Sequence, residues 1–283
     1  GYFDQALLLT NEFLPRGAGI VYMEGMHRSR QEYNADGRGK LRDIKLTVLI
    51  DEGSASSSEI FAGAMVDYGR AVVAGDEATY GKGTVQVPRG LADYMPYFSS
   101  REGCGMIKVT TQKFYRVGGA STQLKGVSSD IVLPTVTAGL RIGEAEQDYA
   151  MAYDEIPRAG GYVKSSRIAR ILPELLARSQ ARVAQDKDMQ YTREDIERAR
   201  ERHEKNIVSL NKAVREAENA QLLERKKTID AERKQRYEQL AAEDEKQLTI
   251  YRLKLADVKL PKLPLASKDD DDEYMDENED PED

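Results

Sequence analysis

The stretch from Leu49 to Gln86, LIDEGSASSSEIFAGAMVDYGRAVVAGDEATYGKGTVQ, decides the fold of this chain. It continues an apolar run, Leu46 to Ile50, which is short and branched and lies between charged or turn residues, as buried strands do. A loop of small residues follows at 53–57. From Ser58 on, apolar residues recur every three or four positions, which predicts an amphipathic helix. A second strand is predicted at Ala71–Ala74, so the order of elements indicates α/β architecture.

The serines of this loop lie where a strand passes into a helix. Free backbone N–H groups and the positive end of the helix dipole converge at such a turn, which suits a nucleophile whose reaction builds an oxyanion. Further on, Lys82 lies between two glycines, and serine followed by lysine suggests a dyad in which an amine accepts the serine proton. Free lysine has a pKa near ~10.4, so such a base must be desolvated. On spacing alone, a helix cap and a solvated lysine explain the same residues.

Three blocks of the sequence resemble the C-terminal processing peptidases, in their tail-specific protease branch: GSASSSEIFAGAMVDYGRAVVAG, TYGKGTVQ and KFYRVGGASTQLKGVSSDIVLP. In that family the loop reads Ser-Ala-Ser-x-Ser-Glu, and its middle serine, here Ser56, is the nucleophile. The family lysine lies in a Tyr/Phe-Gly-Lys-Gly motif, which gives Lys82, and a glutamine four residues on gives Gln86. The connector 75–79 is one residue longer than the family's Gly-Glu-Pro-Thr, which places Ser56 and Lys82 one position further apart.

The resemblance implies a serine endopeptidase that cuts proteins with nonpolar C-terminal tails through an acyl-enzyme. Ser56 would attack the scissile carbonyl, Lys82 would take and return the proton, and Gln86 would orient the lysine. The oxyanion would be held by the backbone N–H of Ser57 and by a second donor from a glycine loop, with Gly1 as the candidate. Neither a cofactor nor a metal ion is expected.

The resemblance also implies the domain organisation. The expected fold is a spiral β/α core, crotonase-like and Clp protease-like, over residues 1–136. A linker at 137–166, a mostly helical domain at 167–258 and a disordered acidic tail at 259–283 would follow. The block KNIVSLNKAVREAEN resembles the helical C-terminal domain of tail-specific proteases. In that family an Asn-Gly-Gly-Gly loop and a tail-selecting PDZ domain precede the core, so we expect a fragment of a protein from the bacterial periplasm or cell envelope.

Composition narrows the function classes. The chain has 283 residues and a net charge of −7, but residues 269–283 alone hold 11 acidic residues and no basic one. Elsewhere 42 basic residues face 38 acidic ones, interleaved along the chain, which argues against a nucleic-acid partner. No run approaches the ~18 apolar residues of a membrane span. The lone Cys104 excludes an intrachain disulfide.

Other elements follow from periodicity. A helix is predicted at 2–14, and strands at Ile20–Met23, Ile107–Val117 and Ile131–Leu133, with an irregular chain from Gln86 to Arg101. In the C-terminal part, helices run with interruptions to about Val258. One continuous helical face is predicted there from seven positions: Ile196, Ala199, His203, Ile207, Leu210, Val214 and Ala217.

Three alternatives stay open at this point. His27, in a polar and basic loop, competes with Lys82 as the base, although its polar and basic neighbours favour a solvated histidine and Lys82 has the better claim. Tyr94, Tyr97 and Phe98 either line an apolar substrate cleft or pack a long loop. The competing function is a scaffold, in which an inactive peptidase core presents long charged helices to a partner protein such as an adaptor; turnover decides between the two.

Overall fold

The computed structural model of the chain describes residues 2–26, 28–94, 104–139 and 142–247, together with residues 249, 251, 262 and 265. Four calls on the sequence lie outside the described residues: Gly1, His27, the pair Tyr97 and Phe98, and the acidic run 269–283. The chain divides into two compact units, Gly1–Asn206 and Ile207–Asp283, and each is described by itself.

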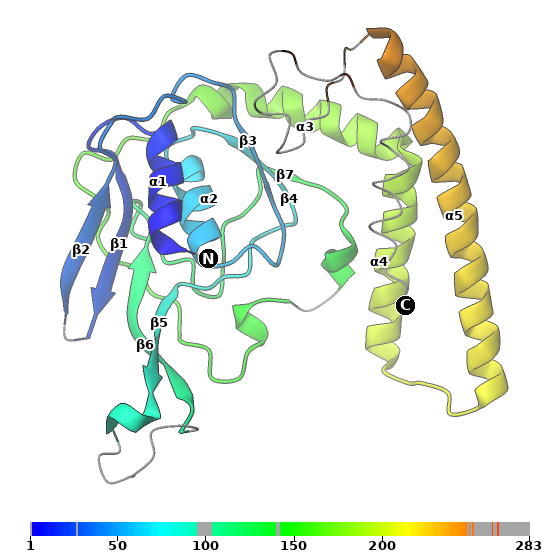
Figure 1. Cartoon of the computed structure of the whole chain (residues 1–283), viewed down its shortest axis with the longest axis horizontal. Helices are drawn as coiled ribbons and strands as arrows, with labels where there is room; N and C mark the ends of the chain where they lie inside the picture. Colours follow the sequence, from blue (N-terminus) through cyan, green and yellow to red (C-terminus); the bar gives the residue numbers. More distant parts are fainter. Residues whose placement is uncertain are drawn as a thin grey trace. The chain divides into compact units, whose positions relative to one another are not determined.

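The core of the first unit contains two sheets and two helices (Figure 1). The antiparallel sheet has the strand order β2-β1-β6-β5, and the parallel sheet has the order β3-β4-β7. The two helices are α1 (Phe3–Phe13) and α2 (Ser57–Asp67). The strands are β1 (Gly19–Gly25), β2 (Arg28–Asn34), β3 (Thr47–Ile50), β4 (Val72–Gly75), β5 (Thr84–Gly90), β6 (Met106–Tyr115) and β7 (Ile131–Val132).

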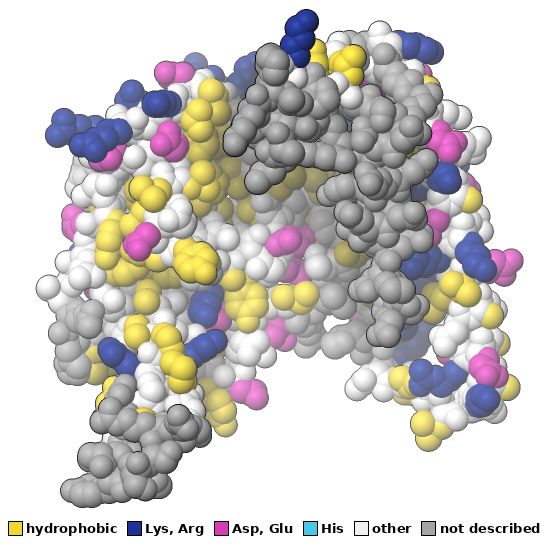
Figure 2. All heavy atoms as spheres, viewed as in Figure 1, with side chains coloured by type: hydrophobic (Ala, Val, Ile, Leu, Met, Phe, Trp, Pro, Cys, Tyr) yellow, Lys and Arg dark blue, Asp and Glu magenta, His cyan; other side chains and the backbone are white. Residues whose placement is uncertain are grey.

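Helix α2 lies between the two sheets, which explains its composition. Ile60 and Met65 join a core cluster with Phe114 of the antiparallel sheet. Ala62 joins another cluster with Val73 of the parallel sheet. A helix buried on both sides is apolar all round rather than striped, as the run IFAGAMV is. The outer face of α1 keeps Leu8 and Leu9 exposed, and Figure 2 shows hydrophobic side chains gathered over this part of the core.

The predicted fold class, an α/β core followed by a mostly helical C-terminal part, is confirmed by these elements. One prediction is wrong: the chain after Gln86 is not irregular, because β5 continues to Gly90 and pairs with β6. In β5 the half-buried Val85 and Val87 alternate with the exposed Gln86 and Pro88, but this alternation is short and a proline interrupts it. Proline is tolerated there because β5 is an edge strand of its sheet.

The segment expected to be a linker contacts the core. The Tyr162 hydroxyl donates a hydrogen bond to the Asp67 carbonyl at 2.7 Å, and its ring meets Tyr68 edge-on at 5.5 Å. Glu155 forms an isolated antiparallel bridge with Ala120. Short 3-10 turns at Leu91–Tyr94, Val136–Gly139 and Glu144–Glu146 complete the first unit outside its helices. The predicted domain boundaries themselves stay a prediction.

Three helices form the C-terminal part: α3 (Arg167–Gln185), α4 (Lys187–Lys205) and, in the second unit, α5 (Lys212–Gln247). The Asp186 side chain caps α4 by accepting from the Met189 N–H at 2.9 Å. The helix ends at Asn206, whose φ of 43° lies in the left-handed region. The continuous face predicted from Ile196 to Ala217 is therefore wrong, since it crosses this break. Among the described helices, none is long and apolar enough to cross a bilayer.

Candidate active site

Ser56 occupies a strained turn between β3 and α2. Its φ and ψ are 56° and −110°, a region that costs a residue with a side chain about 1–3 kcal/mol. Hydrogen bonds on both sides hold it there. Its N–H donates to Glu59 Oε2 at 2.7 Å, and its carbonyl accepts from the Glu59 and Ile60 N–H groups. A sharp strand-to-helix turn of this kind presents a nucleophilic side chain at the mouth of a helix.

The Glu59 carboxylate joins the serine loop to the lysine loop. Besides the Ser56 N–H, its Oε2 accepts from the Lys82 N–H at 2.9 Å. Its Oε1 accepts from the Thr79 hydroxyl at 2.6 Å and from the Gly81 N–H at 2.8 Å. The residue has no exposed surface. One buried side chain thus fixes the backbone at both Ser56 and Lys82.

The donors around Glu59 indicate its charge state. Burial raises the pKa of Glu59, and its four hydrogen bonds oppose that shift. Three of the donors are backbone N–H groups, which cannot accept a proton. The fourth, the Thr79 hydroxyl, already accepts from the Val127 N–H at 2.8 Å, so its own proton is left for Glu59. Because every neighbour donates, the arrangement favours the ionised carboxylate at neutral pH.

The two glycines beside Lys82 are needed by the turn that carries it. Gly81 has a φ of 88°, where a side chain would be strained. A Cβ on Gly83 would lie 2.5 Å from Ser121 Oγ, and the Gly83 N–H donates to Gln123 Oε1 at 2.9 Å. The backbone therefore folds closely on both sides of the lysine, as its sequence setting suggests.

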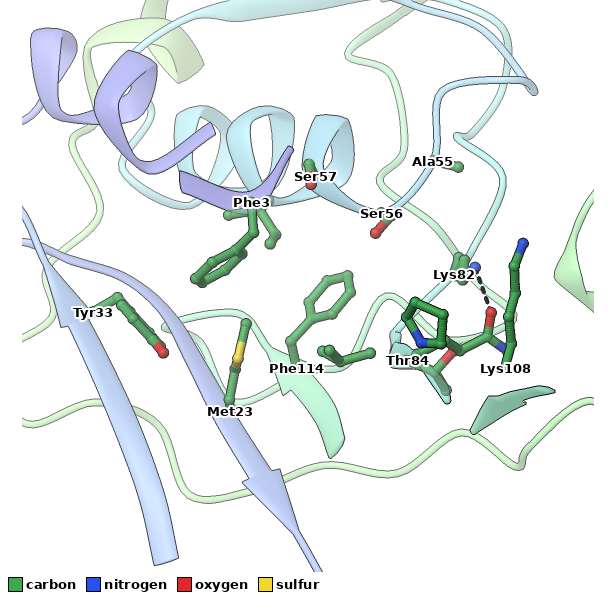
Figure 3. A pocket seen from close by; sticks show the side chains of 14 residues that line it. Phe3, Met23, Tyr33, Ala55, Ser56, Ser57, Lys82, Thr84, Lys108 and Phe114 are labelled. Carbon is green, nitrogen blue, oxygen red and sulfur yellow. Dashed lines mark hydrogen bonds between the residues drawn. The ribbon is translucent and has the colours of Figure 1, made fainter. Parts of the chain in front are cut away.

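Ser56, Lys82 and Gln86 line one cavity of about 530 Å³ (Figure 3). The Lys82 ammonium donates to Gln86 Oε1 at 3.1 Å. No hydrogen bond joins Ser56 Oγ directly to Lys82 Nζ, although both side chains are described. Such bonds are often long in ligand-free sites and tighten when substrate binds. The structure thus brings the three predicted side chains to one site, with the lysine held by the glutamine.

The cavity has an apolar side and a polar side. Phe3, Met23 and Tyr33 lie on one side of Ser56 in Figure 3, and Lys82, Thr84 and Lys108 lie on the other. Tyr94 is 62% exposed and does not line the cavity. Ser56 thus lies between an apolar group of side chains and a polar, basic one.

The longer connector before Lys82 is anchored rather than loose. Asp76, which is 1% exposed, accepts from the Glu52 N–H at 2.7 Å and from the Thr137 hydroxyl at 2.8 Å. It also accepts from the Thr135 hydroxyl. Glu52 belongs to the loop that leads to Ser56, so this carboxylate makes a second link between the two loops.

A third carboxylate anchors the far end of α2. Asp67 pairs with Arg116, with 2.5 Å between Oδ1 and a guanidinium nitrogen. Burial raises the pKa of Asp67, and the Arg116 charge opposes that shift. Analysis of the sequence missed both Asp67 and Glu59. The pattern Ser56-x-x-Glu59 is a capping-box signal that could have pointed to Glu59, whereas a pair 49 positions apart leaves no local signal.

Two predicted site groups are backbone donors. Ser57 is the first residue of α2, so its N–H has no acceptor within the helix and is free to bind an oxyanion. Gly1 and the competing base His27 lie outside the described residues. Within the described part of the chain, no group of three or more His, Cys, Asp or Glu side chains could hold a metal ion.

The chain matches two family models and several known proteases. Residues 1–133 match peptidase family S41, and residues 138–283 match the C-terminal domain of tail-specific protease. The tail-specific protease of Haemophilus influenzae is 36% identical over 222 residues, which are 77% of this chain and 31% of that protein. A probable CtpA-like serine protease of Staphylococcus epidermidis is 33% identical over 48% of this chain and 26% of its own length.

Among solved structures, a photosystem II D1 C-terminal processing protease is similar over 47% of this chain and 31% of its own length, with 30% identity and a TM-score of 0.40. The chain thus spans about a third or less of the length of these relatives. The two family matches together extend over both the core and the helical part. The resemblance seen in the sequence is confirmed, and the chain belongs to peptidase family S41, in its tail-specific protease branch.

Proposed function

We propose that this chain carries the catalytic centre of a serine-type endopeptidase with a Ser–Lys dyad, which cuts proteins that have nonpolar C-terminal tails. One observation supports the dyad above all. Ser56, Lys82 and Gln86 line the same cavity, and Glu59 ties together the backbones of the serine and the lysine. Membership of peptidase family S41 supports a serine peptidase. The name of the Haemophilus relative, tail-specific protease, supports substrates that are recognised by their tails.

In the proposed mechanism, Ser56 Oγ attacks the scissile carbonyl while neutral Lys82 takes its proton. The Gln86 carbonyl accepts one N–H of the amine, which orients the lone pair that receives the proton. The oxyanion is held by the Ser57 N–H and a second backbone donor, for which Gly1 is the candidate. Loss of one such donor costs ~2.7–4 kcal/mol of transition-state stabilisation.

The tetrahedral intermediate then collapses. Lys82 returns its proton to the leaving amine, and the acyl group stays on Ser56. Water attacks the ester with Lys82 again as the base, and the serine is released. The apolar side of the cavity receives the side chain next to the scissile carbonyl, while the leaving segment passes on the lysine side.

The wider setting is also part of the proposal. Tail selection would come from a PDZ domain upstream, which adds the tail as a strand to a sheet edge. The helical part would dock an adaptor or the peptidase core, and the protein would work in the bacterial periplasm or cell envelope. The domain boundaries given above, 1–136, 137–166, 167–258 and 259–283, belong to the same proposal.

Substitution in the full-length protein tests the dyad. Ser56→Ala and Lys82→Ala should each reduce cleavage of an unstructured substrate with an apolar tail to the background rate. Lys45→Ala is the matched control, because Lys45 is exposed and does not line the cavity. If Lys82→Ala keeps most of its activity while His27→Ala loses it, the dyad is wrong. A folded wild-type protein without turnover would favour the scaffold instead.

A further inference from the structure

The catalytic cavity contains a second lysine that the dyad does not use. Lys108 lies on β6, directly opposite Pro88 of β5, and both residues line the cavity. The residue is exposed, and its ammonium has no hydrogen-bond or ion-pair partner among the described residues. Figure 3 shows its side chain rising beside Lys82, across the cavity from Phe3, Met23 and Tyr33.

The lining of the cavity is electrostatically one-sided. Two of its fourteen lining residues are lysines and none is an aspartate or glutamate. The nearby Glu59 carboxylate does not line the cavity: it is buried behind the turn, and its oxygens already accept four hydrogen bonds. Lys82 has to be neutral when it acts as the base, so the lasting positive charge of the cavity is that of Lys108. A cavity lined by one sign of charge attracts the opposite sign.

The position of Lys108 relative to the dyad decides which part of the substrate it meets. Lys82 returns a proton to the leaving amine, so the leaving segment passes on the lysine side of Ser56. Lys108 lies further along that side, on the ribbon that β5 and β6 form. Because Lys108 lines the same cavity as Ser56 and Lys82, and an extended peptide advances ~3.3 Å per residue, we infer that the residues it meets are the first ones of the leaving segment.

We propose that Lys108 is a specificity residue that binds a carboxylate within the first three residues of the leaving segment. The substrate class is therefore an endopeptidase substrate with an apolar residue before the scissile bond and an aspartate or glutamate shortly after it. This inference rests on the proposed Ser–Lys mechanism, because the mechanism defines the leaving side. The contact lies at an exposed rim, so it should favour acidic substrates modestly rather than absolutely.

Paired peptides measure this preference directly. Internally quenched peptides with an apolar residue before the cleavage point would carry Glu or Gln at the first, second or third leaving position. In the full-length protein we expect kcat/KM for the best Glu peptide to exceed that of its Gln partner about fivefold at low salt, as expected for a contact of ~1 kcal/mol. High salt should reduce the ratio, because the contact is exposed.

Charge variants locate the cause. Lys108→Gln should bring the Glu-to-Gln ratio to about one, and Lys108→Glu should invert it, whereas the control Lys45→Gln should keep the wild-type ratio. A wild-type ratio of one at all three positions, or an unchanged ratio in Lys108→Gln, overturns the inference. A variant that only shifts the pH dependence of kcat, equally for both peptides, shows that Lys108 acts on Lys82 and also overturns it. Turnover that survives in Ser56→Ala would instead overturn the proposed function.

Discussion

The two walls of the cavity that contains the proposed dyad are built in opposite ways. The wall that carries Ser56 and Lys82 is fixed by Glu59, which has no exposed surface and accepts four hydrogen bonds. The wall that carries Gln86 and Lys108 is a two-stranded ribbon with exposed side chains on both faces. The first wall holds the proposed nucleophile and base in position, with backbone strain at Ser56. The second is open to change, since its side chains contribute little to folding.

This difference predicts that substitutions in the two walls will affect stability and activity differently. Changes beneath the first wall should reduce stability and activity together, because buried partners are left unsatisfied. Changes on the ribbon should alter the kinetics and leave stability nearly unchanged, because exposed side chains contribute little to it. Loops that carry function on a rigid scaffold follow the same division.

The largest effect is expected for Glu59→Gln. An amide in place of the carboxylate leaves at least one of the N–H groups of Ser56, Gly81 and Lys82 without an acceptor, whichever way it is turned. We expect the free energy of unfolding to fall by about 3 kcal/mol and kcat/KM to fall at least 100-fold. Urea denaturation and peptide cleavage measure the two losses.

The exposed Glu77 provides the matched control, and Glu77→Gln should leave both quantities unchanged. Gln resembles protonated Glu, so the same variant also reports the charge state of Glu59. If Glu59→Gln is as stable as the wild type near pH 7, the carboxyl group is neutral in the folded protein and our assignment of its charge is wrong.

A smaller and purely kinetic effect is expected on the ribbon. Gln86→Ala removes the acceptor of the Lys82 ammonium and should lower kcat about 10- to 100-fold. Its free energy of unfolding should stay within about 0.5 kcal/mol of the wild type, because Gln86 is exposed. Thr110→Ala, directly across the strand pair, is the control and should retain activity. If Gln86→Ala lowered the free energy of unfolding as much as Glu59→Gln does, the two walls would not differ in the way proposed.

The smallest effect is the pH dependence of stability that comes from Tyr115, the buried last residue of β6. Burial raises the pKa of Tyr115 to about 12, and the neighbouring Asp154 adds to the shift. Unfolded tyrosine titrates near ~10. Because the folded pKa is the higher one, the stability that Tyr115 contributes is fully present below pH ~10 and is lost as the pH rises toward about 12.

Urea unfolding between pH 9 and pH 11 tests this shift. The free energy of unfolding should fall with a slope of at most ~1.4 kcal/mol per pH unit from this residue, and Tyr115→Phe should flatten the fall. If the free energy of unfolding falls with pH as steeply in Tyr115→Phe as in the wild type, the pKa of Tyr115 is not raised by burial.

The sequence predicted those parts of this structure that depend on local pattern. The two strands and the helix between residues 46 and 75 follow from runs of apolar residues, and the small-residue loop at Ser56 marks the turn. Strand β5 of the ribbon was missed because its alternation is short and Pro88 argues against a strand, whereas its partner β6 was predicted. The break at Asn206 was missed because Ile207 and Leu210 keep a helical spacing although they are exposed.

The sequence yielded the side chains of the proposed site but not the buried residues that hold them in place. Ser56, Lys82 and Gln86 came from a motif of fixed spacing. The bonds from Glu59 to Thr79 and Gly81 span more than 20 residues and depend on the folded backbone, which no periodicity describes. Lys108 is ordinary in the sequence, and it becomes notable only because strand pairing places it opposite Pro88 in a cavity without acids.

The most direct test of the dyad is rapid-quench mass spectrometry of the full-length protein with a peptide ester. The account predicts an acyl adduct that maps to Ser56 during turnover, and no adduct in Lys82→Ala at neutral pH. An adduct on another residue, or acylation of Ser56 at the wild-type rate in Lys82→Ala, would contradict it.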